Sequence, residues 1–392
     1  MYTRRVLFFY ILLTMDSSNK NQKQTQCVHE GGLRDTLHGG IVSPVYTSTA
    51  YNYLDTGGVK YPRYFNTPNQ VAVENKVAAL ERAPRAVLFS SGMAATMTVF
   101  LSILKAGDHI ILQNDIYGGT HDALSTEMNK IGVGVSFSEP TAKEFAKHVK
   151  ESTKILFIET PSNPLLKIVD IESIVSLARE HSLLCLIDNT FASPINQNPF
   201  DFGVDIVIHS GTKYLGGHSD LCCGIAVTTE ALADRVRETG IHYGGSLDAN
   251  TCYLLERSLK TLHLRVERQN ENALKLATFL EKHPVVSKVY YPGLESHTGH
   301  EIARKQMIGF GGMLSFEVKG DPDKIVRKLK LIKPAISLGG VESTITSPAR
   351  TSHARVPAEE RLRLGIKDSL LRFSVGVENA DDLIRDISGA LA

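Results

Sequence analysis

One lysine follows a strand-like stretch and is flanked by hydroxyl side chains. Residues 205–209, Asp-Ile-Val-Ile-His, lead into Ser210-Gly-Thr212-Lys213. The two hydroxyl groups can donate hydrogen bonds to a phosphate, and the lysine amine stands beside them. An amine next to phosphate-binding groups is what a Schiff-base enzyme using pyridoxal phosphate (PLP) requires. The alternative is a solvated loop lysine, which is the ordinary position of this residue type.

A second window places one carboxylate at the end of an apolar run. Residues 183–187, Leu-Leu-Cys-Leu-Ile, precede Asp188, and such runs between helical stretches are typical of buried parallel strands. Ligands bind beyond the carboxyl ends of these strands, so we expect Asp188 and Lys213 at one edge. Burial would raise the pKa of Asp188 unless a cation lies beside it. The protonated pyridine nitrogen of PLP is such a cation; an Asp that only caps the next segment is the alternative.

Further motifs accompany these two windows in a fixed order along the chain. They are Ser90–Thr96, Tyr117–Thr120, Glu159–Pro164, Ser337–Ser343 and Leu371–Glu378. With them, the chain from about Gly39 to its end resembles the Cys/Met-metabolism family of PLP enzymes. This family includes cystathionine γ-synthases, γ-lyases and β-lyases, methionine γ-lyases and homoserine sulfhydrylases. The resemblance implies an α/β protein of fold type I, with a large, mostly parallel sheet domain and a smaller C-terminal α+β domain.

The resemblance also implies a set of cofactor contacts. Gly92 and Met93 open a helix, whose free N–H groups and positive dipole end favour a phosphate. Tyr117 is expected to stack on the pyridine ring and to help in acid–base steps. The other two expected catalytic residues are Lys213 and Asp188. Tyr61 and Arg63 match an arm motif that reaches the adjacent subunit, although its usual Asn-Pro-Thr is here Asn-Thr-Pro. The expected PLP-binding residues are Tyr61, Arg63, Gly92, Met93, Tyr117, Asp188, Ser210, Thr212 and Lys213.

A buried arginine is the expected anchor for an amino-acid substrate. Arg372 follows two leucines in a strand-like run, and a buried guanidinium needs a partner. The α-carboxylate of the substrate supplies one through a bidentate clamp; a structural ion pair is the alternative. By resemblance, Asn163 and Ser343 support this clamp, and the freed Lys213 amine removes the Cα proton.

Substrate choice depends on less specific signals. Glu342 stands where family members that act at Cγ of cystathionine or homoserine esters usually carry Glu. The cystathionine enzymes often place an arginine two residues after Tyr-Gly-Gly-Thr, whereas this chain has His121 and Asp122, and a carboxylate cannot clamp a carboxylate. Arg350 could compensate, although a solvent-facing arginine is the alternative.

We therefore expect a PLP-dependent trans-sulfuration enzyme, a γ-lyase or γ-synthase that acts at Cγ of cystathionine or an O-acylhomoserine. Methionine γ-lyase, homoserine sulfhydrylase and cystathionine β-lyase remain open, because elimination and replacement share early steps. A PLP aminotransferase shares the fold but does not need the Glu342 segment. A non-catalytic PLP-fold protein would be expected to have lost Lys213, Asp188 or Arg372, and all three are present.

Composition excludes several other classes. The 392 residues include 43 basic and 42 acidic side chains, a net charge of +1, so nothing favours binding to nucleic acid or acidic membranes. The 5 cysteines include no C-x-x-C pair, a pattern typical of a reduced, cytoplasmic protein. We expect no metal site and only small amino-acid substrates.

The chain divides into three expected regions. Residues 1–70 form an N-terminal extension and intersubunit arm, 71–262 a PLP-binding α/β domain, and 263–392 a C-terminal domain. Residues 1–14 resemble the start of a signal peptide, but the apolar run is short and no cleavage site follows, which favours a misassigned start codon. A long helix is expected over about 249–282. The resemblance implies a homotetramer of dimers with shared active sites.

Overall fold

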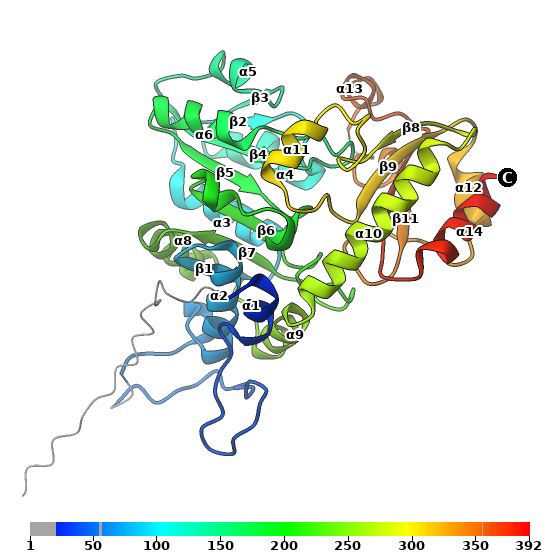
Figure 1. Ribbon diagram of the computed structural model, residues 1–392. Coiled ribbons are helices and arrows are strands. Elements are labelled where there is room, and N and C mark those ends of the chain that lie inside the picture. The colour runs from blue at the N-terminus through cyan, green and yellow to red at the C-terminus, as the bar shows by residue number, and fades with distance from the viewer. Residues whose placement is uncertain (1–20, 55–56, 355) are drawn as a thin grey trace, which may run out of the picture.

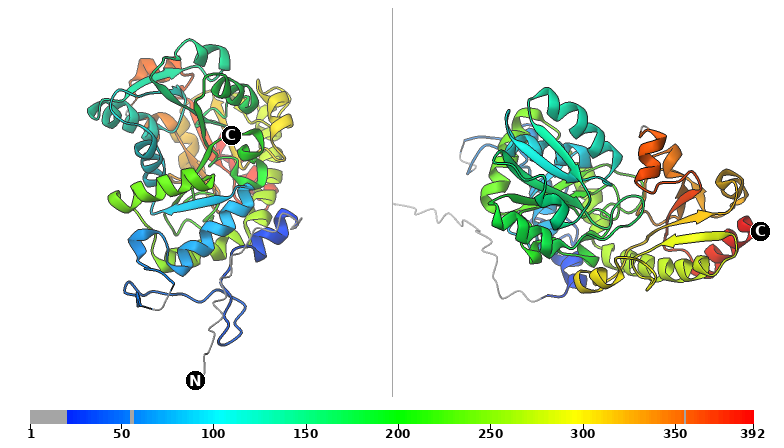
Figure 2. Two further views of the ribbon diagram at one scale, coloured as in Figure 1. Left: turned by 90° about the vertical axis from the view of Figure 1, so that its left-hand side faces the viewer. Right: turned by 90° about the horizontal axis from the view of Figure 1, so that it is seen from above.

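The computed structural model describes residues 21–54, 57–354 and 356–392, so the expectation for residues 1–14 lies outside the described residues. A large sheet and a small sheet form two bodies that lie side by side (Figures 1 and 2). The large sheet has the strand order β1-β7-β6-β5-β4-β2-β3. Only β7 runs antiparallel to its neighbours, so the expected mostly parallel sheet is confirmed. Its strands are β1 (Arg85–Phe89), β2 (His109–Gln113), β3 (Gly134–Ser138), β4 (Thr153–Glu159), β5 (Leu184–Asp188), β6 (Ile206–Ser210) and β7 (Gly224–Thr228).

Both faces of the large sheet are buried beneath helices. Along β4, Leu156 and Ile158 enter one apolar cluster, and Ile155 and Phe157 enter another, as side-chain alternation in a strand requires. The first cluster is covered by α2 and α6, the second by α3 and α8. The helices of this body are α2 (Pro68–Glu81), α3 (Gly92–Ile103), α4 (Gly118–Ala123), α5 (Ala142–Ala146), α6 (Ile171–Glu180), α7 (Ser193–Asn196), α8 (Glu230–Tyr243) and α9 (Ala249–Leu259), with the π-helix η2 (Leu124–Met128) and the 3-10 helix η3 (Pro199–Phe202).

The second body is built on a five-stranded sheet of order β10-β11-β12-β9-β8. Helix α10 (Leu262–Glu281) leads to it from the large body, and Figure 1 shows it running alongside β9. The other elements are β8 (Val286–Tyr290), α11 (His300–Gln306), β9 (Met313–Val318), α12 (Pro322–Lys328), β10 (Lys333–Pro334), β11 (Thr344–Thr346), η4 (Pro348–Arg350), α13 (Ala358–Arg363), β12 (Leu370–Ser374) and α14 (Ala380–Leu391).

The expected helix over 249–282 is wrong in one respect, because it is two helices. Helix α9 ends at Leu259 and α10 begins at Leu262. The Arg265 guanidinium binds the carbonyl oxygens of Tyr214 and Ser258 at 2.7 and 2.9 Å. These contacts hold the start of α10 against the loop that follows Lys213. The interruption between α9 and α10 is therefore accompanied by a tertiary contact.

The N-terminal segment was expected to be irregular, yet it contains α1 (Lys23–His29) and the 3-10 helix η1 (Pro62–Tyr64). Between them the chain extends below the large body in Figure 2. Its apolar side chains are widely exposed: Leu37 by 82% and Ile41 by 99%. Such exposure is typical of a surface that another chain covers.

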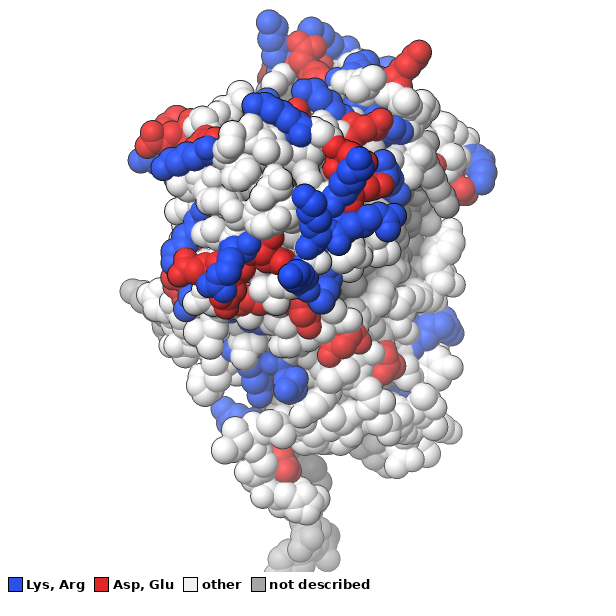
Figure 3. Space-filling model, turned by 90° about the vertical axis from the view of Figure 1, so that its right-hand side faces the viewer, with Lys and Arg blue, Asp and Glu red and all other residues white. Residues whose placement is uncertain are grey.

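On the face shown in Figure 3, basic and acidic side chains are interspersed. Within the described ranges, no helix is both long and apolar enough to cross a bilayer. The same residues contain no group of three or more His, Cys, Asp or Glu that could hold a metal ion.

Candidate active site

Three neighbouring strands of the large sheet end in polar side chains at one edge. They are Glu159 on β4, Asp188 on β5 and Ser210 on β6, and Glu159 is the register partner of Asp188. Lys213 follows in a tight turn, where its backbone N–H donates to the Ser210 carbonyl at 3.1 Å. The structure thus brings Asp188 and Lys213 to the same edge.

The turn before α3 lies against the end of β6. The Ser91 hydroxyl caps α3 by accepting from the Ala94 N–H at 3.1 Å, while the first helical amides have no intrahelical partner. A β-carbon at Gly92 would lie 2.8 Å from the Ser210 β-carbon, so the two segments touch only because residue 92 is glycine. The first amides of α3 and the Ser210 side chain therefore lie next to one another, an arrangement that suits a phosphate.

Two threonines fix the geometry of this pocket. The Thr190 backbone N–H donates to Asp188 Oδ1 at 2.9 Å, and the Thr190 hydroxyl accepts from the Ser210 N–H at 2.8 Å. Thr212 Oγ1 accepts from the Cys223 N–H at 3.1 Å and lies 3.3 Å from the Cys223 carbonyl oxygen. The ends of β5, β6 and β7 are thus linked by hydrogen bonds around Lys213.

Lys213 and Arg372 are connected through a serine of the second body. Lys213 Nζ donates to Ser337 Oγ at 2.9 Å, and Arg372 Nη2 lies 3.5 Å from the Ser337 carbonyl oxygen. Arg372 Nη1 donates to Asn163 Oδ1 at 2.8 Å. Arg372 and Asn163 are both buried. The arginine and asparagine expected to clamp a carboxylate are therefore in contact, next to the lysine.

The site places two cations near two carboxylates, the buried Glu159 and the half-buried Asp188. Burial lowers the pKa of Lys213, and the Arg372 charge lowers it further. Burial lowers the pKa of Arg372 to about 10, against the opposing effect of Glu159. Burial raises the pKa of Asp188. Burial and the neighbouring Asp188 raise the pKa of Glu159 well above its ordinary value. A lysine with a lowered pKa suits proton transfer near neutral pH.

The residues present fit PLP. Asp188 is a half-buried carboxylate that forms no ion pair with a described residue, and a pyridinium nitrogen is the cation that would keep it ionised. The Gly92 amide and Ser210 offer phosphate donors, and Lys213 offers the amine. This donor set would hold the phosphate, ring nitrogen and aldehyde carbon of one molecule.

Tyr117 directly precedes α4 and is 44% exposed. Its backbone N–H donates to Glu159 Oε2 at 2.8 Å. A β-carbon at Gly118 would lie 2.5 Å from the Ser352 carbonyl oxygen, and one at Gly119 2.5 Å from Tyr117 Cε1. Both glycines are needed for this close packing, which leaves the ring of Tyr117 accessible to a ligand.

Two residues named from the sequence lie elsewhere. Ser343 was expected to support the substrate clamp, but it is 1% exposed and its hydroxyl donates to Glu378 Oε2 at 2.9 Å. Arg350 could have compensated for a missing arginine, with a solvent-facing arginine as the alternative. Its guanidinium pairs with Asp323 on α12 and its side chain is 55% exposed, which agrees with the solvent-facing alternative.

Tyr61 directly precedes η1 and Arg63 lies within it, in the arm. The Arg63 guanidinium binds the Ile241 carbonyl oxygen near the end of α8 and lies 5.5 Å from the Tyr64 ring centre. Tyr61 packs edge-on against Tyr64, with ring centres 5.3 Å apart. In the single chain Tyr61 therefore contacts the arm, and Arg63 contacts both the arm and α8.

Sequence reasoning missed the roles of Ser337, Glu159 and His353. Ser337 and Glu159 belong to motifs already recognised, and Glu159 ends an apolar strand just as Asp188 does, so the same argument could have found it. His353 is buried, and burial and Arg372 lower its pKa to about 4. No spacing pattern links His353 to the other site residues in sequence.

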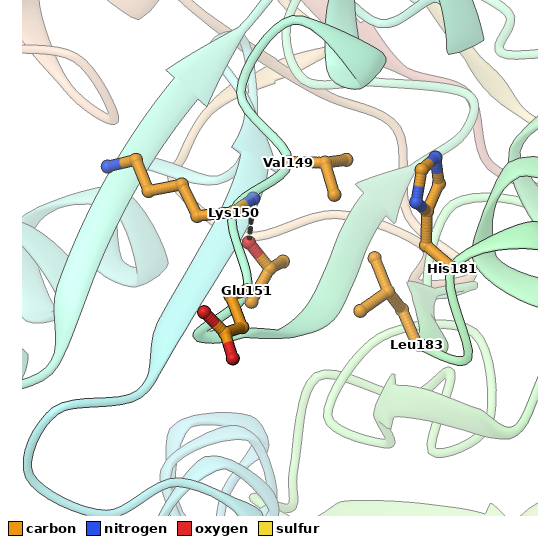
Figure 4. Close-up of a pocket in the computed structure, with 6 residues that line it drawn as sticks. Val149, Lys150, Glu151, His181 and Leu183 are labelled. Atoms are coloured by element: carbon orange, nitrogen blue, oxygen red, sulfur yellow. Dashed lines mark hydrogen bonds between the residues drawn. The ribbon is translucent and has the colours of Figure 1, made fainter.

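A surface hollow of about 370 Å³ is lined by Val149, Lys150, Glu151, Thr153, His181 and Leu183 (Figure 4). It lies at the amino ends of β4 and β5, because Thr153 and Leu184 begin those strands. The polar cluster around Asp188 is at their carboxyl ends. The hollow is therefore separate from the candidate active site.

Fold and site together define a PLP-dependent enzyme of fold type I. The family model for the Cys/Met metabolism PLP-dependent enzymes matches residues 24–392. The cystathionine γ-lyase of Bacillus subtilis is 42% identical over 377 residues, 94% of this chain and 99% of its own. The cystathionine β-lyase of Coxiella burnetii is 43% identical over 390 residues, 97% and 100% of the two chains.

A solved structure agrees with the sequence comparisons. Cystathionine γ-lyase from Lactobacillus plantarum, complexed with L-serine, has a TM-score of 0.91 and 40% identity, and the match covers 94% of this chain and 98% of that one. The chain belongs to the Cys/Met metabolism PLP-dependent enzyme family.

Proposed function

We propose that this enzyme cleaves or exchanges the Cγ–sulfur or Cγ–oxygen bond of cystathionine or an O-acylhomoserine. The observation that carries the proposal is the position of Glu342. Its exposed carboxylate lies 3.4 Å from the hydroxyl of Ser219, in the loop that follows Lys213. A carboxylate at the rim of the site suits the distal ammonium group of cystathionine. Relatives of nearly equal identity are named γ-lyase and β-lyase, so similarity alone favours neither reaction.

Each polar group has a defined task in this proposal. PLP, when bound, supplies an electron sink for charge that develops at Cα. Lys213 holds the cofactor and moves a proton at Cα, for which its lowered pKa is suited. Asp188 holds the proton on the pyridine nitrogen. Arg372 and Asn163 orient the α-carboxylate, and Tyr117 covers the ring.

The bond changes balance for cystathionine. The Cγ–S bond breaks and sulfur leaves with a proton as the thiol of cysteine. Water then releases ammonia, and the four-carbon fragment becomes 2-oxobutanoate. In the synthetic direction the Cγ–O bond of an O-acylhomoserine breaks, the cysteine sulfur forms the Cγ–S bond of cystathionine, and the thiol proton leaves with the carboxylic acid.

We further propose that the site is completed by a second copy of this chain, in a homotetramer of dimers. The exposed apolar arm supports this second proposal, because the side chains of Leu37 and Ile41 are not buried by other residues of the same chain. Tyr61 and Arg63 lie on the same arm and would reach the partner's phosphate pocket. The described cysteines are all unpaired, which supports a reducing, cytoplasmic location.

The keto acid formed from cystathionine tests the proposed reaction. Purified holoenzyme should release 2-oxobutanoate, identified by chromatography, and Lys213→Ala should release none. Glu342→Gln should lower kcat/KM for cystathionine by roughly tenfold, the loss expected for a charged contact. Pyruvate as the main product would show cleavage at Cβ. Methionine turnover with inert cystathionine would favour a methionine γ-lyase.

A further inference from the structure

Glu159 is a buried carboxylate with no task in the reaction proposed above. It ends β4, between β2 and β5, and is 4% exposed. Its Oε2 accepts from the Tyr117 N–H at 2.8 Å, and its Oε1 accepts from the Asn163 N–H at 2.9 Å. Each carboxylate oxygen therefore holds the backbone of a different residue of the candidate site.

The backbone of Glu159 is itself fixed by a side chain from β2. Its N–H donates to Gln113 Oε1 at 2.9 Å, and its carbonyl oxygen accepts from Gln113 Nε2 at 3.0 Å. The side chain of Asn163 in turn accepts a hydrogen bond from the Arg372 guanidinium. An unbroken set of hydrogen bonds thus runs from Tyr117 through Glu159 and Asn163 to Arg372.

A carboxylate at this position needs a specific reason, because burying a charge beside Asp188 is unfavourable. A glutamine has one acceptor oxygen and an NH₂ group that cannot accept. The two amides face different oxygens of Glu159, so a glutamine at this position would place its NH₂ group against one of them. A carboxylate is the side chain of this length that can accept from both at once.

We propose that Glu159 is a positioning residue that fixes the Tyr117 turn relative to the Asn163–Arg372 clamp. It links the part of the site that covers the cofactor ring to the part that binds the substrate carboxylate. This inference rests on the site residues proposed above. It does not depend on which carbon–sulfur bond is cleaved.

The test compares Glu159→Gln holoenzyme with wild type. Glycine, which offers an α-carboxylate and no side chain, is titrated against the visible absorbance of bound PLP. We expect PLP to be retained, its visible circular dichroism to change as the Tyr117 ring shifts, and glycine affinity to fall by roughly tenfold or more. Glu159→Asp keeps the charge but is one methylene shorter, and should show the same two changes.

Glu74→Gln is the matched control. Glu74 on α2 is also buried, and its carboxylate accepts from the Leu88 N–H at 3.1 Å and from Arg237 Nη2 at 2.9 Å. This variant should lower the melting temperature and leave both glycine affinity and circular dichroism unchanged.

Wild-type affinity and dichroism in either Glu159 variant would make Glu159 a structural residue only and overturn the proposal. Combining Glu159→Gln with Asn163→Ala should weaken glycine binding by less than the product of the single effects, because both act on one clamp. Full additivity would overturn the link to the clamp. An enzyme inert toward cystathionine would count against the proposed reaction alone.

Discussion

At the scale of single residues, Gly92 makes a direct prediction. A β-carbon there would lie 2.8 Å from the Ser210 β-carbon, and overpacking of this kind costs about 1–3 kcal/mol. Gly92→Ala should therefore weaken PLP binding by roughly tenfold or more, as measured by equilibrium dialysis. Gly389→Ala is the control: it lies in α14 with no atom within 4 Å of the added carbon. It should bind PLP normally and gain about 0.5–1 kcal/mol of stability. Unchanged PLP affinity in Gly92→Ala would contradict the packing account.

The residues that sequence reasoning placed best are those with an unusual environment for their type. Lys213, Asp188 and Arg372 are charged side chains at or within apolar strands, and the structure brings them together. Ser337 and Ser343 begin and end one motif, and neither has an environment unusual for a serine. From the sequence alone, either hydroxyl could therefore face the site. The structure decides between them, since Ser337 contacts Lys213 and Ser343 contacts Glu378.

At the scale of elements, strands buried on both faces could be predicted, because they read as continuous apolar runs. The expected strand over residues 183–187 corresponds to β5, and the expected helix from Gly92 is α3. Strand β3 was not predicted, since it lies at the sheet edge and its Gly and Ser residues break the apolar pattern. The break after α9 was missed as well, because no Gly or Pro marks it.

At the scale of the whole molecule, the arm predicts that active sites are shared. An Arg63→Ala chain and a Lys213→Ala chain should each be inactive alone. Mixed dimers should regain activity, because one of their two sites combines an intact arm with an intact lysine. A mixture of Lys213→Ala with Asp188→Asn is the control and should stay inactive, since both changes damage the body of the site. Absence of complementation in verified heterodimers would show that each site is built from one chain.

The position of the arm could not be derived from one sequence in the same way as the sheet. Burial within the chain fixes the strands, whereas the exposed Leu37 and Ile41 gain their packing from whatever covers them. The irregular composition of residues 15–70 indicated an arm, and the family resemblance supplied its role.

The central claim is that Lys213 carries PLP, and its most direct test is chemical. The holoenzyme is reduced with borohydride, which makes the lysine–cofactor bond permanent, and its peptides are mapped by mass spectrometry. The account predicts a pyridoxyl group on the peptide that contains Lys213, and none in a Lys213→Ala chain treated in the same way. A pyridoxyl group on a different lysine of the wild-type enzyme, with Lys213 unmodified, would contradict it.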